Sequence, residues 1–511
     1  MTRRELIQRS IRGLSAAALA HVGSGCGAWA ASASRSDAAG RGSVGAVQGG
    51  ALQTLETQLT GEVVWPGHPR YEHARKVWNG VADRHPALIV RPADSADVSL
   101  AVRFAREYDL PLAIRSGGHS IAGHGTIDDG LLVDVSTMQR LRIDPYRRIA
   151  RAQAGLRWEQ YMAAAQKYEL ATTSGDVASV GLGGLTLGGG IGWFVRKHGL
   201  TIDNLLAVDA VTAEGQLITA SAAEHPDLFW ALRGGGGNFG VATEFTFRLH
   251  PGGTILGGAV FYSAAEALTV VRAAADYAAQ APDELTIQIV LMSAPPAPFI
   301  PPTHRGKLAV ALFVCCTGDL QEAARIVAPL RRLGSPIADA ITPMPYPAMF
   351  ALTEPATVKG EYHDVRSMFL RTMDEQVVGA IVDGASRGTQ VYPRVQIRVL
   401  GGAMARVPKR TTAFFHRDKP FMCSIFNSTP DRCAFEAQQP WLEEFWQTMQ
   451  PWADGVYVNF LNDEGQERVR EAYGPHYGRL RQLKARYDPD NLFNANQNIK
   501  PRPSPASHAA G

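Results

Sequence analysis

Residues 112–120 read Leu-Ala-Ile-Arg-Ser-Gly-Gly-His-Ser, a short apolar strand that runs directly into a turn with two glycines and His119. Glycine has no Cβ, so the backbone N–H groups of such a turn can point at a phosphate or another anion. A Gly-Gly pair is also typical of an ordinary tight turn after a strand. The stretch therefore leaves two interpretations open, an anion-binding loop and a plain turn.

A second stretch is richer still in glycine. Residues 181–192 read Gly-Leu-Gly-Gly-Leu-Thr-Leu-Gly-Gly-Gly-Ile-Gly, a density that argues against a helix. Such a backbone is expected to pack against something flat or anionic. The segment lacks both the later acidic residue of a Rossmann fingerprint and the lysine of a P-loop, so it fits neither nucleotide-binding pattern.

Hydrophobic periodicity predicts two domains. Apolar strand patterns alternate with helical ones from residue 87 to residue 249, beginning with a β-α-β unit whose helix we expect Ser95 to cap. Beyond residue 251 the glycine density falls, and further strands and helices follow. The expected elements are strands at 87–90, 112–114, 131–135, 207–213, 244–249, 286–292, 307–315 and 396–400, and helices at 158–167, 320–333 and 466–487.

Length and composition agree with this division. The chain has 511 residues, 45% of them hydrophobic, which is enough for two buried cores. The predicted segments are an export signal at 1–40, a linker and lead-in at 41–71, a first domain at 72–250, a second at 251–454, a segment at 455–500 that returns to the first, and a tail at 501–511.

The charge balance points to a small-molecule partner. There are 51 Lys and Arg against 48 Asp and Glu, without runs of like charge, which argues against a nucleic-acid partner. No later stretch has the about 18 apolar residues of a membrane span. The cysteines lack CxxC spacing, and His119 and His124 have no further ligands nearby, so no metal is expected. Nothing indicates an oligomeric state.

The N-terminus looks like a twin-arginine export signal. Arg3-Arg4 precedes a mildly apolar stretch, 13–33, that is rich in Ala, Gly and Ser. This pattern predicts a periplasmic or secreted protein. The alternative is the basic N-terminus of a cytoplasmic protein.

Several motifs taken together resemble one family. They are Arg115-Ser-Gly-Gly-His-Ser120, the glycine run with Arg196-Lys-His-Gly-Leu200, Asp203-Asn204, and Asp227-Leu-Phe-Trp-Ala-Leu-Arg-Gly-Gly-Gly-Gly-Asn-Phe-Gly240. Near the C-terminus, Tyr457-Val-Asn459 and Asp488-Pro-Asp-Asn-Leu-Phe-Asn-Ala-Asn496 add to them. From about residue 71 to 501 the chain resembles the berberine-bridge-enzyme-like FAD-linked oxidases of the vanillyl-alcohol-oxidase superfamily.

The resemblance implies an α+β fold, with a PCMH-type FAD-binding domain of two subdomains and a substrate domain whose antiparallel sheet and helices roof the flavin. It implies a covalent bond from His119 to the flavin, although a lone histidine of this kind is otherwise an ordinary loop residue. The cofactor-binding residues implied are Arg115, Ser116, Gly117, Gly118, His119, Ser120, Gly123, Val180, Gly181, Gly183, Gly184, Gly188, Gly190, Gly199, Asn204, Val241, Asn459 and Asn496.

Two valines refine this expectation. Many relatives form a second flavin bond through a cysteine where this chain has Val177, so we expect a single covalent link and no large oligosaccharide substrate. Val180 stands where relatives that react with oxygen tend to have valine. The resemblance therefore favours O2 as electron acceptor over another acceptor.

Three residues are candidates for the chemistry on the substrate. Tyr457 matches the family's closing Tyr-x-Asn and could accept a proton if a nearby positive charge lowered its pKa, although a packed tyrosine is the plainer reading. Period two places Gln396 and Arg398 on one face of a strand, where some relatives have a carboxylate base. Arg398 could equally lie on the surface, which leaves the proton acceptor open.

The function expected is that of an FAD-dependent oxidase, which takes hydride from an alcohol or amine carbon and gives H2O2 from O2. A dehydrogenase with another acceptor would share every motif. A secreted flavin-binding protein without turnover is the third reading.

Overall fold

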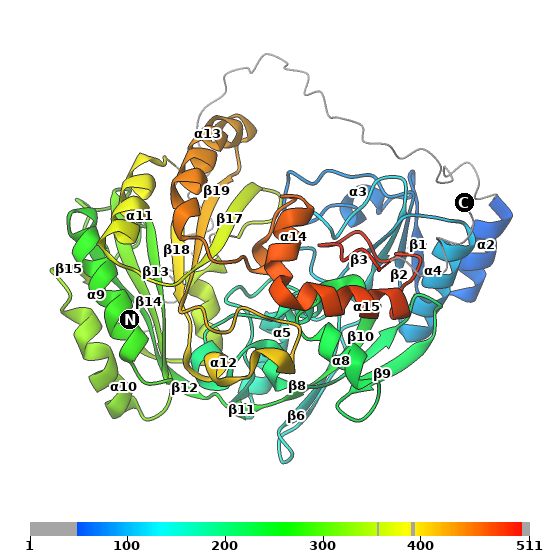
Figure 1. Cartoon of the computed structure of the whole chain (residues 1–511), viewed down its shortest axis with the longest axis horizontal. Coiled ribbons are helices and arrows are strands. Elements are labelled where there is room, and N and C mark those ends of the chain that lie inside the picture. Colours follow the sequence, from blue (N-terminus) through cyan, green and yellow to red (C-terminus); the bar gives the residue numbers. More distant parts are fainter. Residues whose placement is uncertain (1–48, 355–356, 390–393, 503–511) are drawn as a thin grey trace.

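The computed structural model describes residues 49–354, 357–389 and 394–502, so the export signal expected at 1–40 lies outside the described residues. Figure 1 shows two halves side by side, one built around two small sheets and the other around a large sheet. Within the described part, no helix is long and apolar enough to cross a bilayer. The mixed architecture confirms the α+β class expected from the sequence.

The first small sheet grows from the predicted β-α-β unit. β2 and β3 both pair parallel with β4, and β1 pairs antiparallel with β2. The helix α4 begins after Asp94, whose side chain accepts hydrogen bonds from two N–H groups of the first turn, so Asp94 and not Ser95 is the cap. The bounds are β1 Glu62–Val64, β2 Leu88–Arg91, α4 Ser95–Glu107, β3 Leu112–Arg115 and β4 Leu131–Asp134.

The second small sheet is antiparallel, in the order β5-β6-β10-β8-β9. Its apolar residues join those of the first sheet and α4 in one core. A two-stranded ribbon of β7 and β11 leads toward the other half. The bounds are β5 Leu141–Asp144, β6 Ile149–Gln153, α5 Trp158–Gln166, β7 Leu170–Ala171, β8 Leu205–Val211, β9 Leu217–Ser221, α8 Pro226–Leu232, β10 Val241–Arg248 and β11 His250–Pro251.

The large sheet is antiparallel throughout, as the family resemblance implies. Successive side chains along each strand point to opposite faces of the sheet. One face packs against the helices α9, α10, α11 and α13, and the other faces the first half. The strands are β12 Thr254–Ser263, β13 Leu285–Ser293, β14 Leu308–Cys316, β15 Pro336–Asp339, β16 Thr342–Pro345, β17 Tyr362–Leu370, β18 Val395–Val399 and β19 Phe421–Thr429, and the helices are α9 Ala267–Gln280, α10 Leu320–Val327, α11 Glu375–Arg387 and α13 Arg432–Met449.

The glycine-rich run contains a helix, so the expectation that its glycine content excludes one was wrong. α6 spans Leu182–Gly188, and Gly189 ends it with a φ of 134°. Leu182, Thr186 and Leu187 are buried, and Thr186 Oγ1 donates to the carbonyl of Leu182 at 2.7 Å. Tertiary burial of these side chains overrides the poor helix propensity of the glycines.

Two long predicted helices also end early. The C-terminal one is divided into α14, Gln466–Tyr473, and α15, Tyr477–Tyr487, because Gly474 has a φ of 52° and Pro475 follows it. The helix predicted at 320–333 ends as α10 at Val327 and continues only as a 3-10 turn that contains Pro329.

The C-terminal segment is fixed to the first half through Lys484, which also belongs to a buried ion pair within the segment. Lys484 and Asp488 have fully buried side chains with their charged atoms 2.6 Å apart. Lys484 also donates to the carbonyls of Asn238 and Phe493, each at 2.8 Å. These bonds join α15 to the loop that contains Asn238 and to the chain after residue 488.

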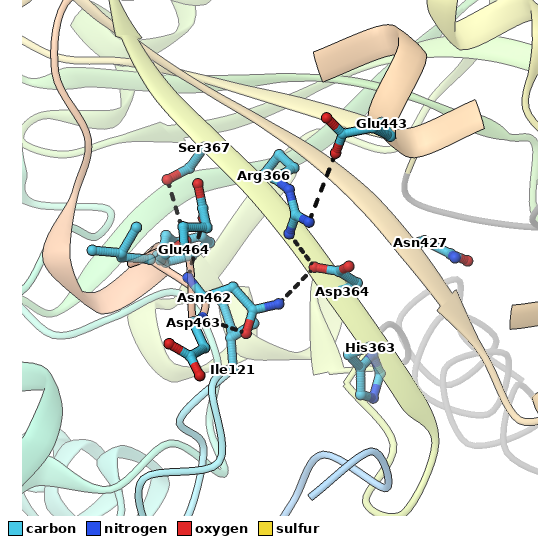
Figure 2. A network of polar contacts seen from close by, with 12 residues as sticks. Ile121, His363, Asp364, Arg366, Ser367, Asn427, Glu443, Asn462, Asp463 and Glu464 are labelled. Atoms are coloured by element: carbon cyan, nitrogen blue, oxygen red, sulfur yellow. Dashed lines mark hydrogen bonds and ion pairs between the residues drawn. The ribbon is translucent and has the colours of Figure 1, made fainter. Parts of the chain in front are cut away.

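A second polar network fixes the same segment to the large sheet (Figure 2). Asp364 on β17 accepts hydrogen bonds from Asn462 at 2.7 Å and from Arg366 at 2.6 Å. Arg366 also reaches Glu443 on α13, 4.0 Å away. Residues 457–462 are thereby held against the inner edge of the large sheet, next to the cavity described below.

We expect Lys484→Met to lower the free energy of unfolding by about 3–5 kcal/mol, because it leaves the buried charge of Asp488 without its partner. The matched control is Arg486→Met on the same helix. The Arg486 side chain is 65% exposed in its ion pair with Asp227, so the loss should stay below about 1 kcal/mol. Urea titration followed by tryptophan fluorescence measures both. Equal losses in the two variants would contradict the role given to the buried pair.

Candidate active site

A cavity of about 370 Å³ lies between the small sheets and the inner face of the large sheet. Its lining comes from β3 and α6 on one side, from β13, β14, β17, β18 and β19 on the other, and from residues 457–461 and 493–497. The structure brings together there most of the residues selected from the sequence: Arg115, Ser116, Gly117, Gly118, His119, Ser120, Val180, Gly181, Gly183, Gly184, Gln396, Arg398, Tyr457, Asn459 and Asn496.

Two glycine loops form one wall of the cavity. The backbone at Gly117 lies so close to that at Gly181 that a Cβ on either residue would collide with the other. Ser116 connects the loops, since its Oγ accepts a hydrogen bond from the N–H of Gly183 at 3.3 Å and donates to the carbonyl of Ala154 at 2.5 Å. The requirement for glycine at both positions is therefore steric.

His119 points its ring into a short aromatic stack. Its ring lies 5.1 Å from that of Trp78 at an interplanar angle of 18°, and Trp78 lies 3.9 Å from His363 at 10°. Burial, reinforced by the positive charge of Arg157, lowers the pKa of His119 to about 3. The imidazole is thus neutral near neutral pH and keeps one nitrogen lone pair free to act as a nucleophile.

The lining fits FAD in two respects. A Cβ built at Gly184 or Gly237 meets nothing within 4 Å, so the cavity continues past both backbones. Gly117 and Gly118 also belong to this lining, and a backbone without Cβ atoms can approach a phosphate closely.

Tyr457 lines the cavity and is buried. Its hydroxyl oxygen accepts hydrogen bonds from the N–H of Gly190 and from Asn459 Nδ2, both at 2.8 Å. Burial raises the pKa of Tyr457 to about 12, while these two donors and the charge of Arg398 act in the opposite direction. Because both donors occupy acceptor sites on the oxygen, the phenolic proton is directed elsewhere.

Arg398 is a buried cavity residue rather than a surface one. Its Nη2 and Nε donate to Asp176 Oδ2 at 2.7 and 3.1 Å, and Gln288 Nε2 donates to the same oxygen at 2.8 Å. The guanidinium also stacks over Phe460, 4.8 Å from the ring centre. Gln396 bonds to Gln288, so the polar side chains of β18 and β13 form one connected group.

The other predicted cofactor residues stand outside the cavity lining, as far as the described residues show. Gly190 supports Tyr457 through its N–H, and Asn204 donates to the carbonyls of His198 and Leu200. Their contacts with a cofactor stay predictions. The residues concerned are Gly123, Gly188, Gly190, Gly199, Asn204 and Val241.

Two residues of the site were missed in the sequence. Trp78 stacks on His119, and Asp176 forms the ion pair with Arg398. Nothing in the sequence marked Trp78 as a site residue, because it lies far from the Arg115–Ser120 motif along the chain. Asp176 did give a signal: it is a charged residue in a mainly small and apolar stretch, 174–180, where a buried charge is expected to need a partner.

Comparison with known proteins agrees with this site. Residues 86–221 match the family described as FAD binding domain, and residues 456–500 match the family described as berberine and berberine like. The FAD-linked oxidoreductase YvdP of Bacillus subtilis (strain 168) is 31% identical over 456 residues, which cover 87% of this chain and 99% of that protein.

Two solved structures have a similar fold. The 6-hydroxy-D-nicotine oxidase of Arthrobacter nicotinovorans superposes with a TM-score of 0.78 at 28% identity, over 87% of this chain and 98% of that one. The glucooligosaccharide oxidase of Acremonium strictum, which carries a 6-S-cysteinyl, 8α-N1-histidyl FAD, superposes with a TM-score of 0.76 at 22% identity, over 89% of this chain and all of that one.

The fold, the glycine-walled cavity and these matches define an FAD-dependent oxidoreductase. Within that class, the chain belongs to the berberine-bridge-enzyme-like family of FAD-linked oxidoreductases.

We expect Gly184→Leu to reduce the FAD content of the purified protein by roughly tenfold or more, because its side chain would extend into the cavity and overpacking costs about 1–3 kcal/mol. Gly379→Leu is the matched control, a helical glycine on α11 that also has free space around it but does not line the cavity. The ratio of flavin to protein absorbance measures both. Equal FAD contents would contradict the placement of the cofactor beside Gly184.

Proposed function

We propose that this protein is an oxidase that removes hydride from an alcohol or amine carbon and passes the electrons to O2, giving H2O2. FAD, when bound, supplies the hydride acceptor. The observation that carries the proposal is that a neutral His119 and an enclosed Tyr457 line the same cavity. His119 is suited to attachment of the cofactor, and Tyr457 is suited to removal of a proton from the substrate.

His119 is the proposed point of attachment. Its neutral imidazole has the free lone pair that bond formation to the flavin 8α-methyl carbon requires, and the histidyl FAD of the Acremonium strictum enzyme supports this role. Val177 lines the cavity with an apolar side chain that cannot form a thioether. The described lining contains no cysteine, which supports a single covalent link.

Tyr457 is the proposed proton acceptor. The hydrogen bonds from Gly190 and Asn459, together with the charge of Arg398, favour its phenolate, whereas burial opposes ionisation. Holding the hydroxyl in one place also orients the substrate's own hydroxyl or amine toward it. Asp176 balances the charge of Arg398 and keeps it beside the cavity.

The electron acceptor and the location of the enzyme are further parts of the proposal. Val180 lines the cavity, and in the resemblance a valine at this position favours reaction with O2 over another acceptor. The twin-arginine pattern at Arg3-Arg4 favours export of the folded, cofactor-loaded protein.

The first test concerns the covalent bond. We expect flavin fluorescence to stay with the wild-type band in denaturing electrophoresis and to disappear in His119→Ala. His416→Ala is the matched control, because His416 is a buried histidine whose pKa is also lowered by burial but which does not line the cavity, so this variant should keep the fluorescence. A dark wild-type band would contradict the covalent link.

The second test concerns Tyr457. Since its pKa lies near 12, the phenolate fraction and the anaerobic rate of flavin reduction should both rise with pH from about pH 6 to about pH 9. Tyr457→Phe should lower that rate by about 10²- to 10⁴-fold and abolish its rise with pH.

Tyr473→Phe is the control for the second test. Tyr473 is a second buried tyrosine of the cavity, and its hydroxyl bonds to the carbonyls of Gly235 and Gln497. This variant should keep the rise with pH. A Tyr457→Phe enzyme that retains both the rate and the slope would remove Tyr457 from the chemistry, and flavin reduction without O2 consumption would indicate a dehydrogenase.

A further inference from the structure

The orientation of the His119 ring depends on Trp78. Among the described residues, Trp78 is the one whose ring stacks on that of His119, with the ring centres 5.1 Å apart and an interplanar angle of 18°. His119 stands on a loop directly after Gly117 and Gly118, and Gly118 has a φ of 70°. Glycine offers no side chain for packing, so these loop neighbours cannot hold the imidazole.

Trp78 is fixed in turn by the large sheet. Its ring stacks on that of His363 on β17, with the centres 3.9 Å apart and an angle of 10°, and its Nε1 donates to the carbonyl of Thr357 at 2.9 Å. His363 is 1% exposed, and its Nδ1 lies 3.0 Å from Ser428 Oγ on the neighbouring strand β19. Trp78 therefore packs against one histidine from each half of the molecule.

The backbone around Trp78 joins the same two parts of the structure. The N–H of Trp78 donates to the carbonyl of Gly118 at 3.0 Å. The next residue, Asn79, is 2% exposed, and its Nδ2 donates to the carbonyls of Ile121 and His363 at 2.8 and 2.9 Å. Both of these acceptor residues are drawn in Figure 2, with His363 on β17. This short segment thus connects the loop after β3 to the large sheet.

The covalent bond proposed for His119 makes a demand on the orientation of its ring. The bond joins a ring nitrogen to the flavin 8α carbon, while one C–H bond of that carbon and one N–H bond of the imidazole break. The two protons and two electrons are left on the flavin, from which O2 takes them as H2O2. The lone pair of the nitrogen lies in the plane of the ring, so the ring has to present its edge to the carbon. Stacking holds the face of the ring and leaves the edge free.

We propose that Trp78, held by His363, is a positioning residue for the covalent attachment of FAD, which keeps the His119 ring turned so that a nitrogen at its edge reaches the flavin. This inference rests on the proposed covalent link and deepens it. Trp78 belongs to the first half and His363 to the large sheet, so attachment also depends on the packing of the two halves against each other.

The rate of covalent attachment tests the inference. The full-length chain is produced without flavin in a riboflavin-starved host and mixed with FAD, and the flavin fluorescence that survives denaturing electrophoresis is followed with time. Trp78→Leu keeps a large apolar side chain but removes the ring, so the limiting rate should fall by about 10- to 100-fold. The FAD concentration at half the limiting rate should change by less than about threefold, because orientation is lost and not affinity.

Conservative variants and a control show whether stacking is responsible. Trp78→Phe and His363→Phe keep a ring at each position, and both should attach FAD within about threefold of the wild-type rate. His363→Leu should slow attachment by a smaller factor than Trp78→Leu, because His363 acts through Trp78. Trp65→Leu is the control and should keep the wild-type rate, since Trp65 also contacts a histidine, His68, but does not line the cavity. Melting temperature and total bound FAD verify that each variant is folded.

Four outcomes would overturn the inference. The first is an unchanged limiting rate in folded Trp78→Leu, and if more FAD were then needed, Trp78 would be a cofactor-binding residue only. The others are a Trp78→Phe chain that is as slow as Trp78→Leu, an unchanged rate in His363→Leu, and an equal loss of rate in Trp65→Leu.

The same electrophoresis separates this inference from the proposed function. A wild-type chain that never retains flavin would contradict the covalent link and the inference together. Attachment that depends on Trp78, in a protein that then releases no H2O2 with any alcohol or amine, would contradict the oxidase and retain the inference. Peroxide release and covalent flavin with no dependence on Trp78 would retain the oxidase and contradict the inference alone.

Discussion

The contact between Gly117 and Gly181 is the constraint on which the rest of the site depends. Two loops from distant parts of the sequence meet there backbone to backbone, with no room for a side chain on either. This approach fixes the His119 loop against the segment that begins α6, and Ser116 secures it by hydrogen bonds to both sides. One continuous wall results, on which a flat cofactor can lie.

The opposite side of the cavity depends on a charge pair that joins the two halves. Asp176 comes from the loop before α6 and Arg398 from the large sheet, and both are buried. Neither charge would be tolerated there alone, so the pair holds the halves in register and also fixes the charge that acts on Tyr457. Removing a single partner should therefore disturb cofactor, base and substrate together.

Much of the site could be predicted because its signals are local. The strand and turn at 112–120 follow from apolar periodicity and glycine, and period two correctly placed Gln396 and Arg398 on one face. The family resemblance added FAD and the antiparallel sheet. Four local expectations failed. α6 forms despite its glycines, and Asp94 replaces Ser95 as a cap because its carboxylate reaches the first turn. The helices predicted at 320–333 and 466–487 are both interrupted near a proline.

The sequence by itself determined the loop that carries His119 and the alternation of strands and helices, since neighbouring residues settle turns and periodicity. The motifs that carry the family resemblance added the class of cofactor. Only the tertiary structure decided that Trp78 stacks on His119 and that Asp176 neutralises Arg398. These contacts join residues far apart in the chain. Their geometry depends on strand register and on how the two halves pack, which no short stretch of sequence specifies.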